Sequence, residues 1–423
     1  MAAMLVLLLA GLLVVAALTV GLAVLIIEGI PRAWNRRTGI TEALRAHPGI
    51  LWALAVAAIY AGATYVRVGS PGPDRMMLTA ANLIGGASLP PALCGTNDVV
   101  MIGGRCYEAM SIGPMLAYLP LVPFAALYGA SRWLVSAAFG ILAAWLCLPL
   151  ARRYGPPGAT WWLAALGAFG TLLFPLAVEG NFYYLAHLEA MAATFVALIE
   201  WRGRRRPSII AGALGVAALA RPTVLLAAIP FGLALVWGSR GRLRAAAVYA
   251  VPLAAAVALM AAYDYLRFGS ATETGYATSV LRTPGLDAVR DQGLFALSHL
   301  APNLALFIGG GFGVRDSFPW LVASNEGQSI LLTTPAVLVA FGAGLRRNWT
   351  LWSAAVLAAI PVFLYYGGGG ADTYGYRYAL DFTPFLLALV AIAVRDHFGG
   401  LERTLIIASI AFCSYGFIWA AFG

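Results

Sequence analysis

Residues 207–238 read PSIIAGALGVAALA-R-PTVLLAAIPFGLALVWG, and Arg221 is the only charged residue among them. A helix needs about 20 mostly apolar residues to cross the hydrocarbon core of a bilayer. In lipid, backbone N–H and C=O groups must be paired within the chain, which leaves helices or closed barrels. Apolar and polar residues do not alternate here, so the stretch predicts two membrane helices that meet at Arg221 and Pro222. The first helix is short, which places this turn below the outer membrane surface.

The rest of the chain is equally apolar. Of its 423 residues, 61% are hydrophobic and 11% are charged, and the mean hydropathy is +0.83. Soluble domains are nearer half apolar and a quarter charged. We therefore predict an all-α fold, a polytopic transmembrane helical bundle that forms a single domain over residues 1–423. About twelve spanning helices are expected, at 4–28, 49–67, 131–150, 159–177, 185–201, 208–220, 222–238, 245–263, 327–345, 349–366, 379–394 and 404–421.

Arginine supplies all of the positively charged side chains, because the chain contains no lysine, and the net charge is +9. A basic protein can bind nucleic acid, but arginine-rich loops also orient a membrane protein, with these loops in the cytoplasm. The second explanation accounts for the charge, so we expect membrane lipids as partners and no nucleic acid. The arginine-rich loops lie at residues 29–48, 152–153, 202–206, 240–244, 346–347 and 395–403.

The loops that carry most of the acidic residues should then face outward. The two largest are 68–112, with an amphipathic helix expected at about 74–85, and 264–326. Since loop 68–112 lies outside and the next arginine pair lies inside, residues 113–150 must cross the membrane an odd number of times. We expect 113–130 to enter the outer leaflet and return as a short re-entrant or interfacial helix, beside an outward-facing cavity.

Four cysteines divide into two pairs by their surroundings. Cys94 and Cys106 share the first outward loop, where an oxidising compartment allows a disulfide between them. Cys147 and Cys413 lie inside apolar helices, which predicts packing roles. The apolar stretch 301–313 is ambiguous, because it is short for a spanning helix.

Known nucleotide and metal motifs are missing from the sequence. It contains no phosphate-binding GxxxxGK[ST], no CxxC and no HExxH, and its four histidines are scattered. We expect no cofactor, although a divalent metal stays open. Polar residues gather instead in the segments predicted to face outward.

Asp74 opens the amphipathic helix in the first loop, and two interpretations are open. It caps the helix and favours its dipole, or it is a general base at the membrane rim. Arg221 also has two interpretations, a structural ion pair with Glu189 or Asp264, and binding of a phosphate, whose geometry guanidinium matches. His187 and Glu189 form an interfacial pair or line a cavity.

The loop before residue 379 reads Gly370-Ala371-Asp372-Thr373-Tyr374-Gly375-Tyr376-Arg377-Tyr378 and follows three further glycines. Tyrosines at a membrane boundary usually form an aromatic belt. Tyrosines beside arginine and aspartate also suit a sugar–phosphate site. The belt is the favoured interpretation for Tyr374 and Tyr376, but not for Arg377.

Five outward motifs occur in an order that resembles the GT-C superfamily of lipid-phosphosugar-dependent glycosyltransferases, which includes protein mannosyltransferase and aminoarabinose transferase relatives. The resemblance covers most of the chain after residue 49. Two positions depart from the pattern: Arg75 follows the acid where a second acid is common, and Cys106 replaces an aromatic residue. The motifs are Asp74-Arg75 to Leu83, Gly104-Arg105-Cys106-Tyr107 with Gly113-Pro114, Ala220-Arg221-Pro222-Thr223, Tyr265-Leu266-Arg267-Phe268-Gly269 and Gly375-Tyr376-Arg377-Tyr378.

This resemblance implies an inverting transferase that moves a sugar from a polyprenyl-phosphate donor to a glycan, lipid or protein acceptor. Asp74 would deprotonate the acceptor hydroxyl. The phosphate would be held by Arg221, with Arg267 and Arg377 as further candidates. The residues expected to line the substrate site are Arg75, Tyr107, His187, Glu189, Tyr374 and Tyr376.

Composition and topology indicate where such an enzyme would work. Abundant alanine, glycine and arginine are typical of a GC-rich bacterial genome, which predicts a multi-pass protein of the bacterial cytoplasmic membrane with its active site facing outward. The rival hypothesis is a transporter or flippase of lipid-linked sugars. Repeated halves with matched broken helices would indicate such a transporter, and no clear internal repeat is found.

Overall fold

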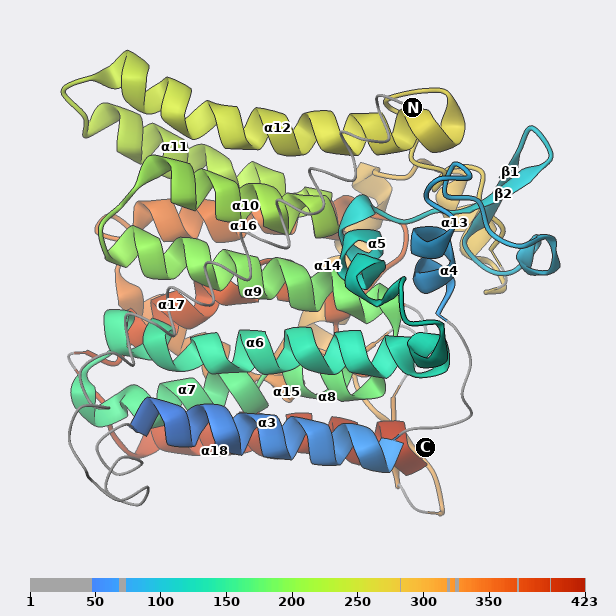
Figure 1. Ribbon diagram of the computed structural model, residues 1–423. Coiled ribbons are helices and arrows are strands. Elements are labelled where there is room, and N and C mark those ends of the chain that lie inside the picture. Colours follow the sequence, from blue (N-terminus) through green and yellow to red (C-terminus); the bar gives the residue numbers. More distant parts are fainter. Residues whose placement is uncertain are drawn as a thin grey trace, which may run out of the picture.

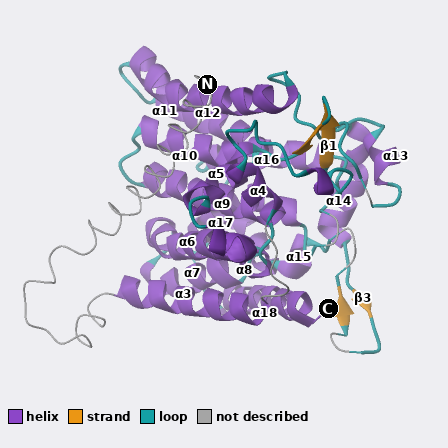
Figure 2. Cartoon of the chain, turned by 45° about the vertical axis from the view of Figure 1, so that its right-hand side comes forward, coloured by secondary structure: helices purple, strands orange, loops and turns teal. Residues whose placement is uncertain are grey.

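The computed structural model describes residues 48–67, 74–281, 283–317, 320–323, 327–370, 373–395 and 397–422. The span expected at 4–28 and most of the arginine-rich loop at 29–48 lie outside the described residues. Within them the protein is a bundle of roughly parallel and antiparallel helices (Figure 1). Figure 2 shows the short strands β1 and β3 at one end of this bundle.

Five helices in the described part of the chain are long and apolar enough to cross a membrane. A sixth span results if α7 and α8 count as one, since they meet at a bend of 40°. The chain is therefore a helical membrane protein. The long helices are α3 (Pro48–Arg67), α6 (Ser131–Tyr154), α9 (Phe182–Arg202), α12 (Arg242–Phe268) and α18 (Gly400–Phe422), and the bent pair is α7 (Thr160–Phe169) and α8 (Leu173–Glu179).

Shorter apolar helices complete the bundle. The segment expected to span at 327–345 is not one regular helix, because a single α-helical turn precedes a 3₁₀ segment that starts at Pro335. The shorter elements of the bundle are α10 (Pro207–Ala220), η5 (Pro222–Ala227), α11 (Ala228–Trp237), α14 (Leu300–Gly309), α15 (Ile330–Thr333), η7 (Pro335–Ala343), α16 (Trp349–Leu364), η8 (Arg377–Asp381) and α17 (Thr383–Ala393).

Helix α9 is the centre of the bundle. It packs against α6 and α10, and its side chains are buried along nearly its whole length. Tyr154 at the end of α6 donates to the Leu198 carbonyl of α9 at 2.8 Å. A helix buried on all sides can hold polar side chains in fixed positions, and two functional candidates, His187 and Glu189, lie on it.

Residues 74–112, the described part of the first loop predicted to face outward, form a small folded unit at the opposite end of the bundle from the arginine-rich turns (Figure 1). This unit keeps the name first outward loop. Its strands pair antiparallel, with Val99 opposite Glu108 and Met101 opposite Cys106. Its elements are α4 (Arg75–Ala81), η1 (Pro91–Leu93), β1 (Val99–Ile102) and β2 (Arg105–Glu108). The other small elements are η4 (Pro157–Ala159), α13 (Leu286–Arg290), η6 (Leu297–His299), β3 (Gly313–Val314) and β4 (Leu321–Val322).

The segment 113–130 does not form a spanning helix. Helix α5 (Ile112–Tyr118) has seven residues, which makes it about 10 Å long against about 30 Å for a hydrocarbon core. Two 3₁₀ turns follow it, η2 (Leu119–Leu121) and η3 (Ala125–Ala130). At 301–313, α14 has ten residues and is likewise too short to span.

Helix α5 packs closely on the end of α10. A Cβ added at Gly113 would lie 2.6 Å from the Ala220 Cα, so only glycine permits this approach. The contact brings the first outward loop next to the Arg221 turn, although the two are far apart in sequence.

Candidate functional site

Asp74 is the N-cap of α4. Its carboxylate accepts the Met76 N–H at 2.8 Å, and its side chain lies beside the Tyr118 hydroxyl. The residue is 5% exposed. Burial raises the pKa of Asp74 to about 6, against the opposing effects of the Met76 N–H, Tyr118 and two nearby arginines. Asp74 is thus a helix cap and also a carboxyl group poised to exchange a proton near neutral pH.

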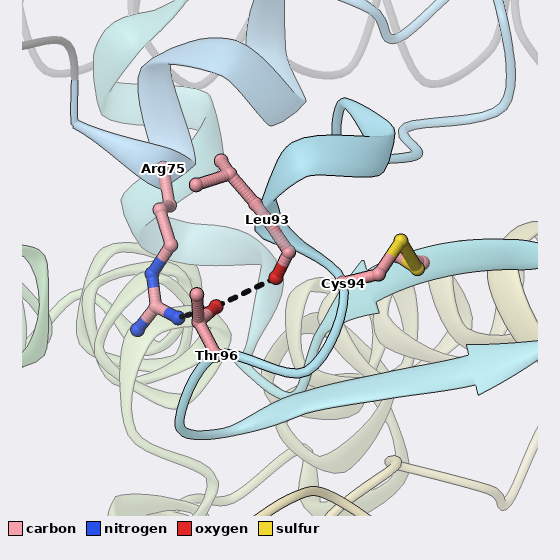
Figure 3. Close-up of a disulfide and its surroundings, with 5 residues drawn as sticks. Arg75, Leu93, Cys94 and Thr96 are labelled. Atoms are coloured by element: carbon pink, nitrogen blue, oxygen red, sulfur yellow. Dashed lines mark hydrogen bonds between the residues drawn. A yellow bond between two sulfur atoms is a disulfide. The ribbon is translucent and has the colours of Figure 1, made fainter.

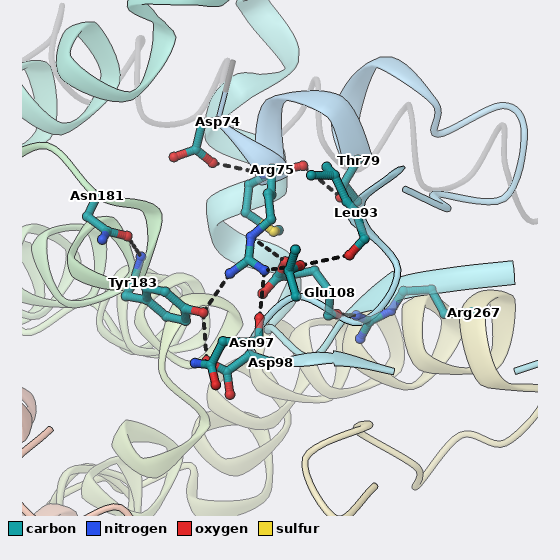
Figure 4. A network of polar contacts seen from close by, with 12 residues as sticks. Asp74, Arg75, Thr79, Leu93, Asn97, Asp98, Glu108, Asn181, Tyr183 and Arg267 are labelled. Atoms are coloured by element: carbon teal, nitrogen blue, oxygen red, sulfur yellow. Dashed lines mark hydrogen bonds and ion pairs between the residues drawn. The ribbon is translucent and has the colours of Figure 1, made fainter. Parts of the chain in front are cut away.

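The guanidinium of Arg75, the next residue, is engaged by polar groups of the surrounding chain (Figure 4). Its Nε lies 3.0 Å from Glu108 Oε2, its Nη2 donates to the Tyr183 hydroxyl at 2.7 Å, and its Nη1 donates to the Asn97 carbonyl at 2.6 Å. The Tyr183 hydroxyl in turn donates to Asp98 at 2.6 Å. Arg75 was expected to line a substrate site, and in the structure its contacts connect α4, the β1–β2 hairpin and α9.

Arg267, at the end of α12, is similarly engaged. Its guanidinium pairs with Asp264 at 2.6 Å and donates to the Glu108 carbonyl at 2.6 Å. Burial raises the pKa of the Glu108 carboxyl well above its usual range, and Arg75 opposes this rise. The hairpin therefore sits between two arginines that are both already paired.

The Arg221 turn holds a second polar cluster, built around Asp381. Arg221 donates from Nε and Nη2 to the Asp381 carboxylate at 3.0–3.1 Å, and Thr223 donates to it at 2.6 Å. The Nδ1 atom of His187 lies 2.8 Å from Asp381 Oδ1. The ion-pair interpretation of Arg221 named Glu189 or Asp264 as its partner, and both identifications are wrong.

Arg377 differs from the other three arginines because it has no carboxylate partner among the described residues. Its guanidinium carbon lies 5.0–5.7 Å from the ring centres of Tyr183, Tyr184 and Tyr378. A Cβ added at Gly370, where φ is +102°, would come within 2.4 Å of Arg377 Nε. The glycine run thus lets the backbone lie directly against this guanidinium.

Two tyrosines join the clusters into one continuous polar band. The Tyr183 ring lies 5.9 Å from the Arg75 guanidinium and 5.7 Å from that of Arg377. The Tyr378 ring lies 5.0 Å from Arg377 and 4.9 Å from Arg221. Asp74 precedes Arg75 in sequence, and its carboxyl group is influenced electrostatically by the Arg75 guanidinium, although its own hydrogen bonds go to Met76 and Tyr118. The band itself extends from Arg75 to the Arg221 turn.

The remaining predicted residues lie in packed surroundings. Tyr107 is buried, with its ring 5.8 Å from that of Phe268. Tyr374 donates to the Phe412 carbonyl at 2.5 Å. Tyr376 is buried with its ring 5.4 Å from that of Phe307. Glu189 is buried in α9, and its Oε1 has no hydrogen-bond partner within the described ranges.

Sequence reasoning missed Asp381, Tyr183 and Tyr378 as members of the band. Asp381 carried one usable signal, since it is an isolated acid at the start of an apolar segment, where an unpaired charge is costly. Glu108 stands next to a motif residue, but its partner could not be read from the sequence. No group of three or more metal-ligating side chains occurs in the part of the chain that the structure describes.

The chain was compared with known families, curated proteins and solved structures. No protein-family model, curated protein or solved structure matches it. The function must therefore be argued from the site itself.

Proposed function

We propose that the protein transfers a sugar, with inversion, from a polyprenyl-phosphate donor to an acceptor hydroxyl of a glycan, lipid or protein. The reaction would take place on the outer face of a bacterial cytoplasmic membrane, in a GT-C-like bundle of about twelve spans. The observation that supports this most is the polar band. Together with the adjacent Asp74, it combines a carboxyl group of raised pKa with the Arg377 guanidinium, which has no carboxylate partner in the described parts of the chain, at the end of the bundle away from the arginine-rich loops.

Asp74 would act as the base. Its carboxylate takes the proton of the acceptor hydroxyl as the oxygen attacks the anomeric carbon. The bond from that carbon to the phosphate oxygen breaks, and the polyprenyl phosphate leaves with the electron pair. A base with a pKa near the working pH suits this transfer, because it is largely ionised beforehand and still accepts a proton.

Arg377 is the first choice for the leaving phosphate. Among the described residues, Arg221 and Arg267 each pair with a carboxylate, whereas the Arg377 guanidinium contacts tyrosine rings and the Tyr378 hydroxyl. A positive group placed beforehand where negative charge develops lowers the barrier without reorganisation. Arg221 would then act through Tyr378, whose ring lies 4.9 Å from the Arg221 guanidinium and whose hydroxyl accepts from Arg377 at 3.2 Å.

The test is release of polyprenyl phosphate from a panel of synthetic polyprenyl-phosphate sugars, with the protein in liposomes. Wild-type protein should release it only when an acceptor is present, and Asp74→Asn should abolish most of the release. If no donor is cleaved and labelled donor instead crosses the bilayer, the flippase hypothesis is correct and the transferase is not.

A further inference from the structure

The disulfide of the first outward loop joins two short segments, the residues that follow Cys94 and the residues that follow Cys106, and these segments are its two flanks. Cys94 and Cys106 are bonded, with their Cα atoms 5.5 Å apart (Figure 3). Thr96 follows the first cysteine by two residues, and Glu108 follows the second by two residues. Each flank therefore projects one polar side chain at the same short distance from the bond.

One guanidinium holds both flanks. Arg75 Nη1 donates to Thr96 Oγ1 at 3.0 Å, and Arg75 Nε lies 3.0 Å from Glu108 Oε2. Thr96 is itself held, because its hydroxyl donates to the Leu93 carbonyl at 2.7 Å. An arginine fork has a rigid planar geometry, so it can engage two partners only if their separation is set. The β1–β2 ladder, which pairs Val99 with Glu108, and the disulfide, which joins Cys94 to Cys106, together set that separation.

The other side of the same guanidinium reaches the bundle. Arg75 Nη2 donates to Tyr183 at the outer end of α9, and the Phe182 ring lies 5.0 Å from the guanidinium carbon. Arg75 is also the first residue of α4, directly after the cap Asp74. Its contacts therefore determine where α4 begins relative to α9.

We propose that Arg75 is a positioning residue that depends on the Cys94–Cys106 disulfide, so that the Asp74 carboxylate is held in place only when this loop is oxidised. The proposal rests on the proposed function for the role of Asp74, but not for the coupling between the disulfide and Arg75. Without the bond, the Thr96 and Glu108 flanks separate and the fork loses at least one of them. The α4 cap then loosens, although every residue of the cap is still present.

The experiment compares three variants with wild-type protein. The first carries both Cys94→Ser and Cys106→Ser, the second carries Arg75→Gln, and the third combines all three substitutions. The control is Arg105→Gln, since Arg105 is an exposed arginine beside Cys106 whose guanidinium donates to the Gly85 carbonyl at 3.3 Å and forms no ion pair with a described residue. Hydrogen exchange of the peptide that contains the Met76 amide reports the cap directly, because this amide donates to Asp74. Exchange should rise by the same factor in all three variants and remain unchanged in Arg105→Gln.

Transfer kinetics provide the second measurement. A displacement of about 1 Å at the base costs about 10²-fold in rate, so kcat should fall about 10²-fold in each variant while the donor KM changes little. If the triple variant multiplies the two separate exchange effects, the disulfide and Arg75 act independently and the proposal is wrong. If wild-type protein shows no transfer activity, only the proposed function is overturned, because the hydrogen-exchange result does not depend on transfer.

If the cysteine variant misfolds, a milder substitution still tests the proposal. Thr96→Val keeps the disulfide and removes the 3.0 Å contact of Arg75, together with the hydrogen bond from Thr96 to the Leu93 carbonyl. It should raise Met76 exchange part of the way toward the Arg75→Gln value. Exchange equal to that of wild-type protein in both Thr96→Val and Arg75→Gln would overturn the proposal.

Discussion

Replacing Asp381 by asparagine should destabilise the protein more than any single change to an exposed ion pair. Asp381 is 1% exposed and accepts hydrogen bonds from Arg221, Thr223 and His187, which connect α9, the Arg221 turn and η8. Asparagine preserves the shape but removes the charge. Arg221, whose side chain is 16% exposed, would then keep an uncompensated charge.

The cost can be bounded from measured cases. Removing one partner of a buried ion pair costs about 3–5 kcal/mol, and Arg221 is nearly buried, so we expect a loss near the lower end of that range. Arg206→Gln is the comparison variant, because it breaks an ion pair at the opposite end of the bundle whose arginine is 50% exposed and whose glutamate is 11% exposed. Its cost should lie below that of Asp381→Asn, toward the roughly 0–1 kcal/mol of exposed pairs, because the arginine is solvated.

The assay is a double-mutant cycle by thermal unfolding in detergent. Asp381→Asn, Arg221→Met and the double variant are compared, because the double variant no longer buries an unpaired charge. Residues that share one network have coupling energies of about 0.5–3 kcal/mol. The double variant should therefore be less destabilised than the sum of the two single variants. A melting temperature for Asp381→Asn equal to that of Arg206→Gln, or exact additivity, would refute the reasoning.

Three other predictions concern the proposed chemistry and the topology. Asp74→Asn should lower the transfer rate by about 10²–10⁴-fold, and the wild-type rate should rise with pH up to about 6, where the Asp74 carboxylate becomes ionised, and then level off; a flat profile would contradict the assignment. Arg377→Ala should weaken donor binding and slow turnover together, whereas Arg105→Ala should do neither. In labelling experiments, a cysteine at the exposed position Ala130 should react only from outside and one at Arg152 only from the cytoplasm; the reverse pattern would show that the orientation is wrong.

The helical membrane fold was accessible from sequence because hydropathy is a local property. Uninterrupted apolar runs predict helices without knowledge of their neighbours, and α6, α9 and α12 match the predicted spans closely. The cysteine pair was accessible for the same reason, since both residues share one polar loop. The cap at Asp74 also followed from local signals.

The partners of the arginines could not be predicted from the sequence, because tertiary packing brings them together. Arg221 and Asp381 are 160 residues apart, and sequence alone favoured acids that were nearer or on the expected face. The break between α7 and α8 and the 3₁₀ segment at Pro335 also depend on packing, which overrides hydropathy. Candidate residues were therefore easier to name than their contacts were to assign.

The contribution of Asp74 to the stability of the protein should depend on pH, and this dependence separates a simple helix cap from a base held ready by burial. Its folded pKa of about 6 lies above the unfolded value of about 4. Between these values the folded state binds more protons, so this residue's contribution to stability falls as pH rises from about 4 to about 6. Above pH 6 the ionised carboxylate costs up to about 3 kcal/mol. A residue selected only as a cap would not carry this cost, since asparagine caps equally well without charge. Asp74→Asn should therefore melt higher than wild-type protein at pH 8 and lose that advantage near pH 4. A variant that melts lower at pH 8 would indicate that the charge itself stabilises the fold, and the argument for a base held ready by burial would fail.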